Sequence, residues 1–169
     1  IRINGCGSIA VGRRARRARR RFTNVAIQRM CVFCGSSPGA RPEYAEAARA
    51  LAKYLVKKNI AIVYGGGHVG LMGILSDTAR SEGGEVIGVI PHGLMAKEVA
   101  DLKLKDLRVV DSMHERKALM ADLSDAFIAM PGGYGTFEEF CEILTWTQLG
   151  IQRKPCGMLN AAGYYDPLL

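Results

Sequence analysis

The chain has 169 residues, 49% of them hydrophobic, a length that suits one domain with a continuous core and is short for two. Charges or glycines interrupt every apolar run before the roughly 18 residues that a membrane-spanning helix needs, so no membrane association is expected. The net charge of +7 is unevenly placed: residues 1–30 hold nine arginines and no acid, and the remainder carries 14 basic against 16 acidic residues. Nucleic-acid binding is therefore not expected of the body of the protein.

Residues 1–29 are predicted to be a basic leader, disordered or non-native, because the first well-patterned segment begins at Met30. An arginine-rich, acid-free tract is also typical of an organelle-targeting presequence or a nucleic-acid arm, and both alternatives stay open. Five cysteines without framework-like spacing favour a reducing compartment, so we expect a cytoplasmic protein, with organelle targeting by the leader as the alternative.

From Met30 onward, short apolar runs alternate with amphipathic ones. The runs predict strands within 30–35, 59–67, 85–91, 107–112, 125–130 and 154–160, and helices starting at Pro42 and within 69–84, 113–124 and 136–150. Strands separated by helices indicate right-handed crossovers and a parallel sheet covered on both faces. The predicted fold class is α/β, a Rossmann-like doubly wound parallel sheet forming one domain over residues 30–169.

Cys31 and Cys34 form a C-x-x-C pair inside the first predicted strand. A zinc site would need a second ligand pair, and the three histidines lack metal-binding spacing from one another. A redox pair normally opens a helix. We therefore predict buried structural thiols and no metal.

Glycine-rich loops follow two of the predicted strands, and ligands of such sheets bind outside the carboxyl ends of the strands. Gly65, Gly67 and Gly70 form a G-x-G-x-x-G pattern, but the next strand ends "VIPHG" without the acid of a dinucleotide site. A tight strand-to-helix turn explains this loop equally well.

The second loop, "PGGYGT" (131–136), is more informative. Its glycines allow consecutive backbone amides to point inward as an anion nest, and Thr136 adds a hydroxyl donor. It lacks the lysine of the Walker loop of nucleoside triphosphatases, so a monophosphate is the better ligand. Glu139 has two interpretations: the last residue of a capping box that starts at Thr136, or a carboxylate facing an anomeric carbon where cleavage of an N-glycosidic bond develops positive charge.

Arg116 and Lys117 open a predicted helix after the fourth strand. A guanidinium there could bind phosphate or ribose oxygens through two hydrogen bonds, whereas a solvated helix face is the plainer interpretation.

The segments "VFCGSSPG", "VYGGGHVGLMG", "VIGVIP", "MHERKALM", "DAFIAMPGGYGTFEEF", "TWTQLGIQRKP" and "GYYDPLL" together resemble the Lonely guy family of cytokinin riboside 5′-monophosphate phosphoribohydrolases, formerly labelled lysine decarboxylase-like. The resemblance implies hydrolysis of N6-substituted AMP to free cytokinin base and ribose 5-phosphate, without metal or cofactor, by a homodimer or a larger assembly of dimers. It places the catalytic pair on Arg116 and Glu139. It places the substrate contacts on Ser36, Glu98, Lys117, Gly132, Gly133, Tyr134, Gly135, Thr136 and Glu138.

The sequence departs from the family pattern at a few points. Lys58-Asn59 stands where a glycine often ends the first helix, a change that Asn tolerates because it adopts the left-handed conformation. Gln152 replaces a frequent histidine, and the chain is expected to lack the family's usual C-terminal helices after Leu169. The alternative function is a non-catalytic nucleotide- or molybdenum-cofactor-binding protein on the same fold.

Overall fold

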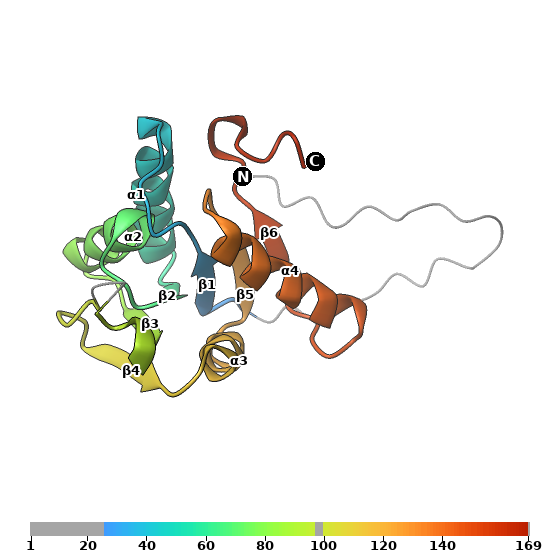
Figure 1. Ribbon diagram of the computed structural model, residues 1–169. Coiled ribbons are helices and arrows are strands. Elements are labelled where there is room, and N and C mark those ends of the chain that lie inside the picture. The colour runs from blue at the N-terminus through green and yellow to red at the C-terminus, as the bar shows by residue number, and fades with distance from the viewer. Residues whose placement is uncertain (1–25, 97–99, 169) are drawn as a thin grey trace.

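The computed structural model describes residues 26–96 and 100–168 (Figure 1). Most of the predicted leader therefore lies outside the described residues, and the first strand begins at Arg29, one residue before the predicted domain start. The strands are β1 (Arg29–Phe33), β2 (Ala61–Tyr64), β3 (Val86–Pro91), β4 (Asp106–Val110), β5 (Ala126–Ala129) and β6 (Cys156–Met158). The helices are α1 (Pro42–Lys57), α2 (Gly70–Ser81), α3 (Met113–Leu123) and α4 (Tyr134–Gln148), with 3-10 turns η1 (His92–Leu94) and η2 (Ala161–Gly163).

The six strands form one sheet in the order β4-β3-β2-β1-β5-β6, and every neighbouring pair is parallel. The predicted parallel α/β fold is confirmed. The chain builds outward from β1 through β2, β3 and β4, then crosses to the other side of β1 to form β5 and β6. The order therefore reverses between β1 and β5, and this switch point is where sheets of this kind bind their ligands.

Alternate residues of β1 enter two different cores, as the period of a strand requires. Val32 packs with apolar residues of α1 and α2 on one face of the sheet. Cys31 and Phe33 pack with residues of α3 and α4 on the other face. Figure 1 shows α1 and α2 together on one side of the sheet and α3 and α4 on the other.

Local sequence sets the ends of α1. Pro42 is its first residue, where a missing amide hydrogen costs nothing because that amide has no partner within the helix. After Lys57 the chain turns through Asn59, which has a φ of 54°. The expected left-handed conformation of Asn59 is thus confirmed. Within the part of the chain that the structure describes, no helix is long and apolar enough to span a membrane.

Candidate active site

A cavity of about 250 Å³ opens at the carboxyl ends of β1 and β5, where the strand order reverses. It brings together residues from β1, the loop after β2, the start of α3 and the start of α4. Eight of the predicted site residues line it: Ser36, Arg116, Gly133, Tyr134, Gly135, Thr136, Glu138 and Glu139. Segments that are more than 100 residues apart in the chain thus form one site.

The glycine loop connects β5 to α4, and its glycines serve different purposes. A Cβ at Gly132 would lie 2.1 Å from Thr136 Oγ1 and 2.9 Å from the backbone nitrogen of Gly35, so only glycine fits there. A Cβ at Gly133 or Gly135 would meet no atom within 4 Å. Gly132 therefore packs against Thr136 and against Gly35, which follows β1. Gly133 and Gly135 line the cavity.

The interpretation of Thr136 and Glu139 as a capping box at the start of α4 is wrong. The helix begins at Tyr134 with Gly133 as its N-cap, so Thr136 is already its third residue. The glycine turn starts the helix two residues earlier than expected, and Thr136 is buried against Gly132. Glu139 consequently lies in the second turn, and capping does not explain its position. It lines the cavity, as the catalytic interpretation requires.

A real cap of this kind opens α3. Ser112 Oγ accepts a hydrogen bond from the backbone nitrogen of Glu115 (3.1 Å), and Glu115 Oε2 accepts one from the backbone nitrogen of Asp111 (3.0 Å). The Ser-x-x-Glu spacing of Ser112 and Glu115 is the sequence signature of such a cap. This cap fixes the helix start that carries Arg116.

Arg116 is 4% exposed and forms part of the cavity wall. Its Nε donates to the carbonyl oxygen of Val89 (3.1 Å), and its Nη2 donates to the carbonyl oxygen of Gly65 (2.9 Å). These two carbonyls, one within β3 and one directly after β2, hold the plane of the guanidinium. The solvated-helix-face interpretation is therefore wrong for Arg116.

Lys117 does not line the cavity. Its Nζ lies 2.6 Å from Glu138 Oε1 and 2.8 Å from Glu142 Oε2, joining α3 to α4. Burial lowers the pKa of Lys117, but the hydrogen bonds to Glu138 and Glu142 outweigh burial and raise it overall. Lys117 thus links α3 to α4 through two ion pairs. Its predicted contact with substrate stays a prediction.

The two cysteines of the C-x-x-C pair are buried, and Cys34 forms part of the cavity floor. Burial, and after it the nearby Glu139 carboxylate, raises the pKa of both thiols well above the ordinary value. Thiols in this state remain protonated and unreactive at neutral pH. The prediction of buried thiols is confirmed for this pair.

Glu98 lies outside the described residues. The cavity also includes apolar side chains that sequence reasoning did not select, namely Leu94, Met113, Met120 and Met72. Their residue types alone do not distinguish them from ordinary core residues. Met113 carried a positional signal, because it starts the helix that bears Arg116.

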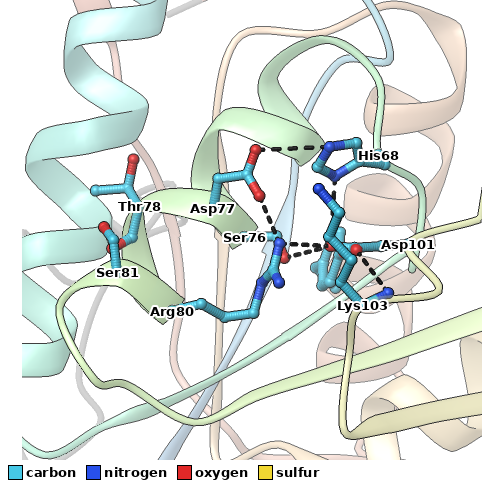
Figure 2. Close-up of polar contacts among 9 residues, drawn as sticks. His68, Ser76, Asp77, Thr78, Arg80, Ser81, Asp101 and Lys103 are labelled. Carbon is cyan, nitrogen blue, oxygen red and sulfur yellow. Dashed lines mark hydrogen bonds and ion pairs between the residues drawn. The ribbon is translucent and has the colours of Figure 1, made fainter.

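A polar network centred on the buried Asp101 supports the loop after β2 (Figure 2). Asp101, with a side chain 1% exposed, accepts a hydrogen bond from Ser76 Oγ (2.8 Å) and lies 3.5 Å from both His68 Nδ1 and Arg80 Nη2. Its backbone nitrogen donates to the carbonyl oxygen of Gly66 (2.9 Å), next to the residue that holds Arg116.

Three members of this network, His68, Asp77 and Asp101, offer nitrogen and oxygen atoms within 4.8 Å of one another, a spacing that a metal ion could use. The Arg80 guanidinium lies among them and pairs with both carboxylates. Its positive charge supplies what a cation would supply, so we interpret the cluster as a structural ion-pair network.

The fold and the cavity define a Rossmann-like α/β protein with a cavity at its topological switch point. The family model described as "Possible lysine decarboxylase" matches residues 72–169. A rice (Oryza sativa subsp. japonica) protein named probable cytokinin riboside 5′-monophosphate phosphoribohydrolase LOGL9 is 57% identical over 85% of this chain and 63% of its own length. Arabidopsis thaliana cytokinin riboside 5′-monophosphate phosphoribohydrolase LOG7 is 53% identical over 87% of this chain and 68% of its own length. The chain belongs to the Lonely guy family.

The chain spans 58% of the length of another rice relative, LOGL5, to which it is 54% identical. Among solved structures, the molybdenum cofactor carrier protein of Chlamydomonas reinhardtii superposes with a TM-score of 0.63 at 21% identity, covering 78% of this chain and 75% of that one. The molybdenum cofactor binding protein of Rippkaea orientalis gives 0.61 at 23% identity, covering 77% and 74%. These likenesses establish a shared fold.

Proposed function

We propose that this protein hydrolyses the N-glycosidic bond of cytokinin riboside 5′-monophosphates. Water adds across the bond between the anomeric carbon and the base nitrogen: a new carbon–oxygen bond forms, the carbon–nitrogen bond breaks, and the base leaves with a proton. The products are ribose 5-phosphate and the free N6-substituted base. Relatives that are 53–57% identical carry names for this activity.

The observation that carries the proposal is the shared cavity. The glycine loop, the Arg116 guanidinium and the Glu139 carboxylate all line one space of about 250 Å³. The first amides of α4 have no partners within the helix and lie at the positive end of its dipole, which suits a phosphate. A phosphate bound there leaves the attached ribose near the second turn of α4, where Glu139 stands.

Each group then has a role. The amides of Gly133 to Thr136 bind the 5′-phosphate, and Arg116 fixes the sugar-phosphate. The Glu139 carboxylate stabilises the positive charge that develops at the anomeric carbon, or orients the attacking water. The apolar wall at Met72, Leu94, Met113 and Met120 accepts the base.

The alternative is a nucleotide- or molybdenum-cofactor-binding protein without turnover. Its support is a common fold at 21–23% identity, which does not carry a ligand from one protein to another. The decarboxylase description is also weak here, because the described residues that line the cavity include no lysine to form a Schiff base with pyridoxal phosphate.

A turnover assay tests the proposal. The protein is incubated with isopentenyladenosine monophosphate and with AMP, and free base is separated by chromatography. We expect wild-type protein to release base and Glu139→Gln, which keeps the shape and removes the charge, to lose at least about 100-fold in kcat. Glu46→Gln removes an exposed charge on α1 and serves as the matched control.

Nucleotide binding without base release by wild-type protein would favour the binding alternative. Full base release by Glu139→Gln would remove Glu139 from the mechanism and leave the activity itself intact.

We also propose a homodimer that forms through the outer side of α4 and the turn after it. Large apolar side chains are exposed there, including Leu144, Leu149 (68%) and Ile151 (67%). An apolar surface of this kind on a folded domain is typical of an interaction site. The resemblance to the family also implies a homodimer, without indicating which surface forms it.

A further inference from the structure

The segment that follows β6 folds back over the glycine loop. Asn160 organises it: its Oδ1 accepts a hydrogen bond from the backbone nitrogen of Tyr165 (2.7 Å), and its Nδ2 donates to Asp166 Oδ1 (2.6 Å). The Tyr164 ring packs edge-on against the rings of Tyr44 in α1 (5.4 Å between centroids) and Tyr165 (5.0 Å). The ring of Tyr164 is therefore held in place independently of its hydroxyl group.

The hydroxyl groups of both tyrosines reach the loop between β5 and α4. Tyr165 donates to the carbonyl oxygen of Met130 and Tyr164 to that of Gly132, each at 2.6 Å. The intervening carbonyl, of Pro131, accepts from the backbone nitrogen of Gly35 (3.1 Å). Three consecutive carbonyl groups are thus bonded from outside the loop.

The two tyrosine contacts differ in what they orient. In a trans peptide the carbonyl of one residue and the N–H of the next point in opposite directions, and the described residues contain no cis peptide. The Gly132 carbonyl shares its peptide plane with the N–H of Gly133, which lines the cavity. The Met130 carbonyl is followed by Pro131, which has no N–H.

Gly133 needs such a restraint. A Cβ at Gly133 would meet no atom within 4 Å, so packing does not fix this residue, and glycine has the widest backbone freedom of all residues. A free loop would have to lose that freedom each time an anion binds, whereas a restrained loop has already lost it.

We propose that Tyr164 is a positioning residue for phosphate binding: its hydroxyl, bonded to the Gly132 carbonyl, turns the Gly133 N–H toward the cavity. Tyr165 anchors the same segment without orienting an amide. Burial, and after it the neighbouring Tyr164, raises the pKa of Tyr165 to about 12, so its hydroxyl stays a donor. This inference rests on the proposed function, because it takes the glycine loop as the phosphate site.

The test compares Tyr164→Phe with Tyr165→Phe, and Tyr54→Phe on the exposed side of α1 is the control. Each variant keeps its ring and loses one hydroxyl. Dissociation constants for AMP, ribose 5-phosphate and adenosine are measured by calorimetry, and Tm is measured alongside. The ratio of AMP to adenosine affinity isolates the contribution of the phosphate from general damage to the fold.

We expect Tyr164→Phe to raise the dissociation constants of AMP and ribose 5-phosphate about five- to tenfold, the range that one hydrogen bond is worth. The dissociation constant of adenosine should not change. Tyr165→Phe should lower Tm more than Tyr164→Phe does and leave the AMP-to-adenosine ratio near the wild-type value. Equal losses for AMP and adenosine in Tyr164→Phe, or no loss for either, overturn the positioning role. Failure of wild-type protein to bind AMP or ribose 5-phosphate overturns the phosphate site itself and with it the proposed function.

Discussion

Gly65→Ala displaces the Arg116 guanidinium without changing Arg116. A Cβ at position 65 would lie 2.1 Å from Nη2 and 3.2 Å from Cζ of Arg116. Non-bonded heavy atoms settle at about 3.5 Å, so the guanidinium has to retreat by more than an ångström. Its hydrogen bond to the Gly65 carbonyl (2.9 Å) then breaks, and its bond to the Val89 carbonyl (3.1 Å) is strained.

The expected effects on stability and on activity differ in size. The clash falls on the end of a flexible side chain, so the fold persists at the expense of one hydrogen bond to a charged group, about 1.5–3 kcal/mol. A misplacement of about 1 Å at a catalytic group costs about 100-fold in rate. We therefore expect kcat/KM for isopentenyladenosine monophosphate to fall about 100-fold in a protein that is still folded at 25 °C.

The assay is steady-state release of free base, with urea unfolding on the same preparations. Gly157→Ala in β6 is the matched control, because a Cβ there meets no atom within 4 Å and Gly157 is not among the residues that line the cavity. It should keep wild-type kcat/KM. Folded Gly65→Ala protein with wild-type kcat/KM would refute the reasoning, since the position of the guanidinium would then be irrelevant to turnover.

Two further predictions concern stability and assembly. Burial raises the pKa of Asp101, but the Ser76 hydroxyl and the charges of Arg80 and His68 outweigh burial and lower it. The contribution of Asp101 to the free energy of unfolding is therefore present above the unfolded pKa of about 4 and disappears as pH falls through the folded pKa. Asp101→Asn should cost about 2 kcal/mol in urea unfolding at pH 7 and less at pH 3; curves that stay parallel to wild type across this range would contradict it. Leu149→Glu should halve the mass measured by sedimentation equilibrium, whereas the exposed Leu102→Glu should not; a wild-type monomer would exclude the dimer.

The sequence predicted the elements and their sheet because local patterns report local structure. Runs such as "AIVY" are fully buried in β2, and alternating apolar runs and helices left a parallel doubly wound sheet as the natural arrangement. The sequence also identified Gly133, Thr136, Arg116 and Glu139, because residues at strand exits converge on one edge of such a sheet.

Local sequence patterns did not determine where α4 begins or which side chains Lys117 contacts. The Thr136-x-x-Glu139 spacing satisfied a capping box, but packing of Gly132 against Gly35 and Thr136 moved the helix start to Tyr134. Lys117 carried the family pattern of a substrate contact, yet its partners in the structure are two glutamates of α4. In both cases a residue distant in sequence or one helical turn away decided between two interpretations that the local pattern allowed.

The sequence alone thus indicated eight of the residues that line the cavity, because strand and helix periodicities are properties of the chain itself. Only the tertiary structure decided how those residues are held. The carbonyls of Gly65 and Val89 orient Arg116, and the hydroxyl of Tyr164 restrains the glycine loop. Such contacts join segments 27 to 51 residues apart, and no local pattern records them, because they exist only once the sheet has brought those segments together.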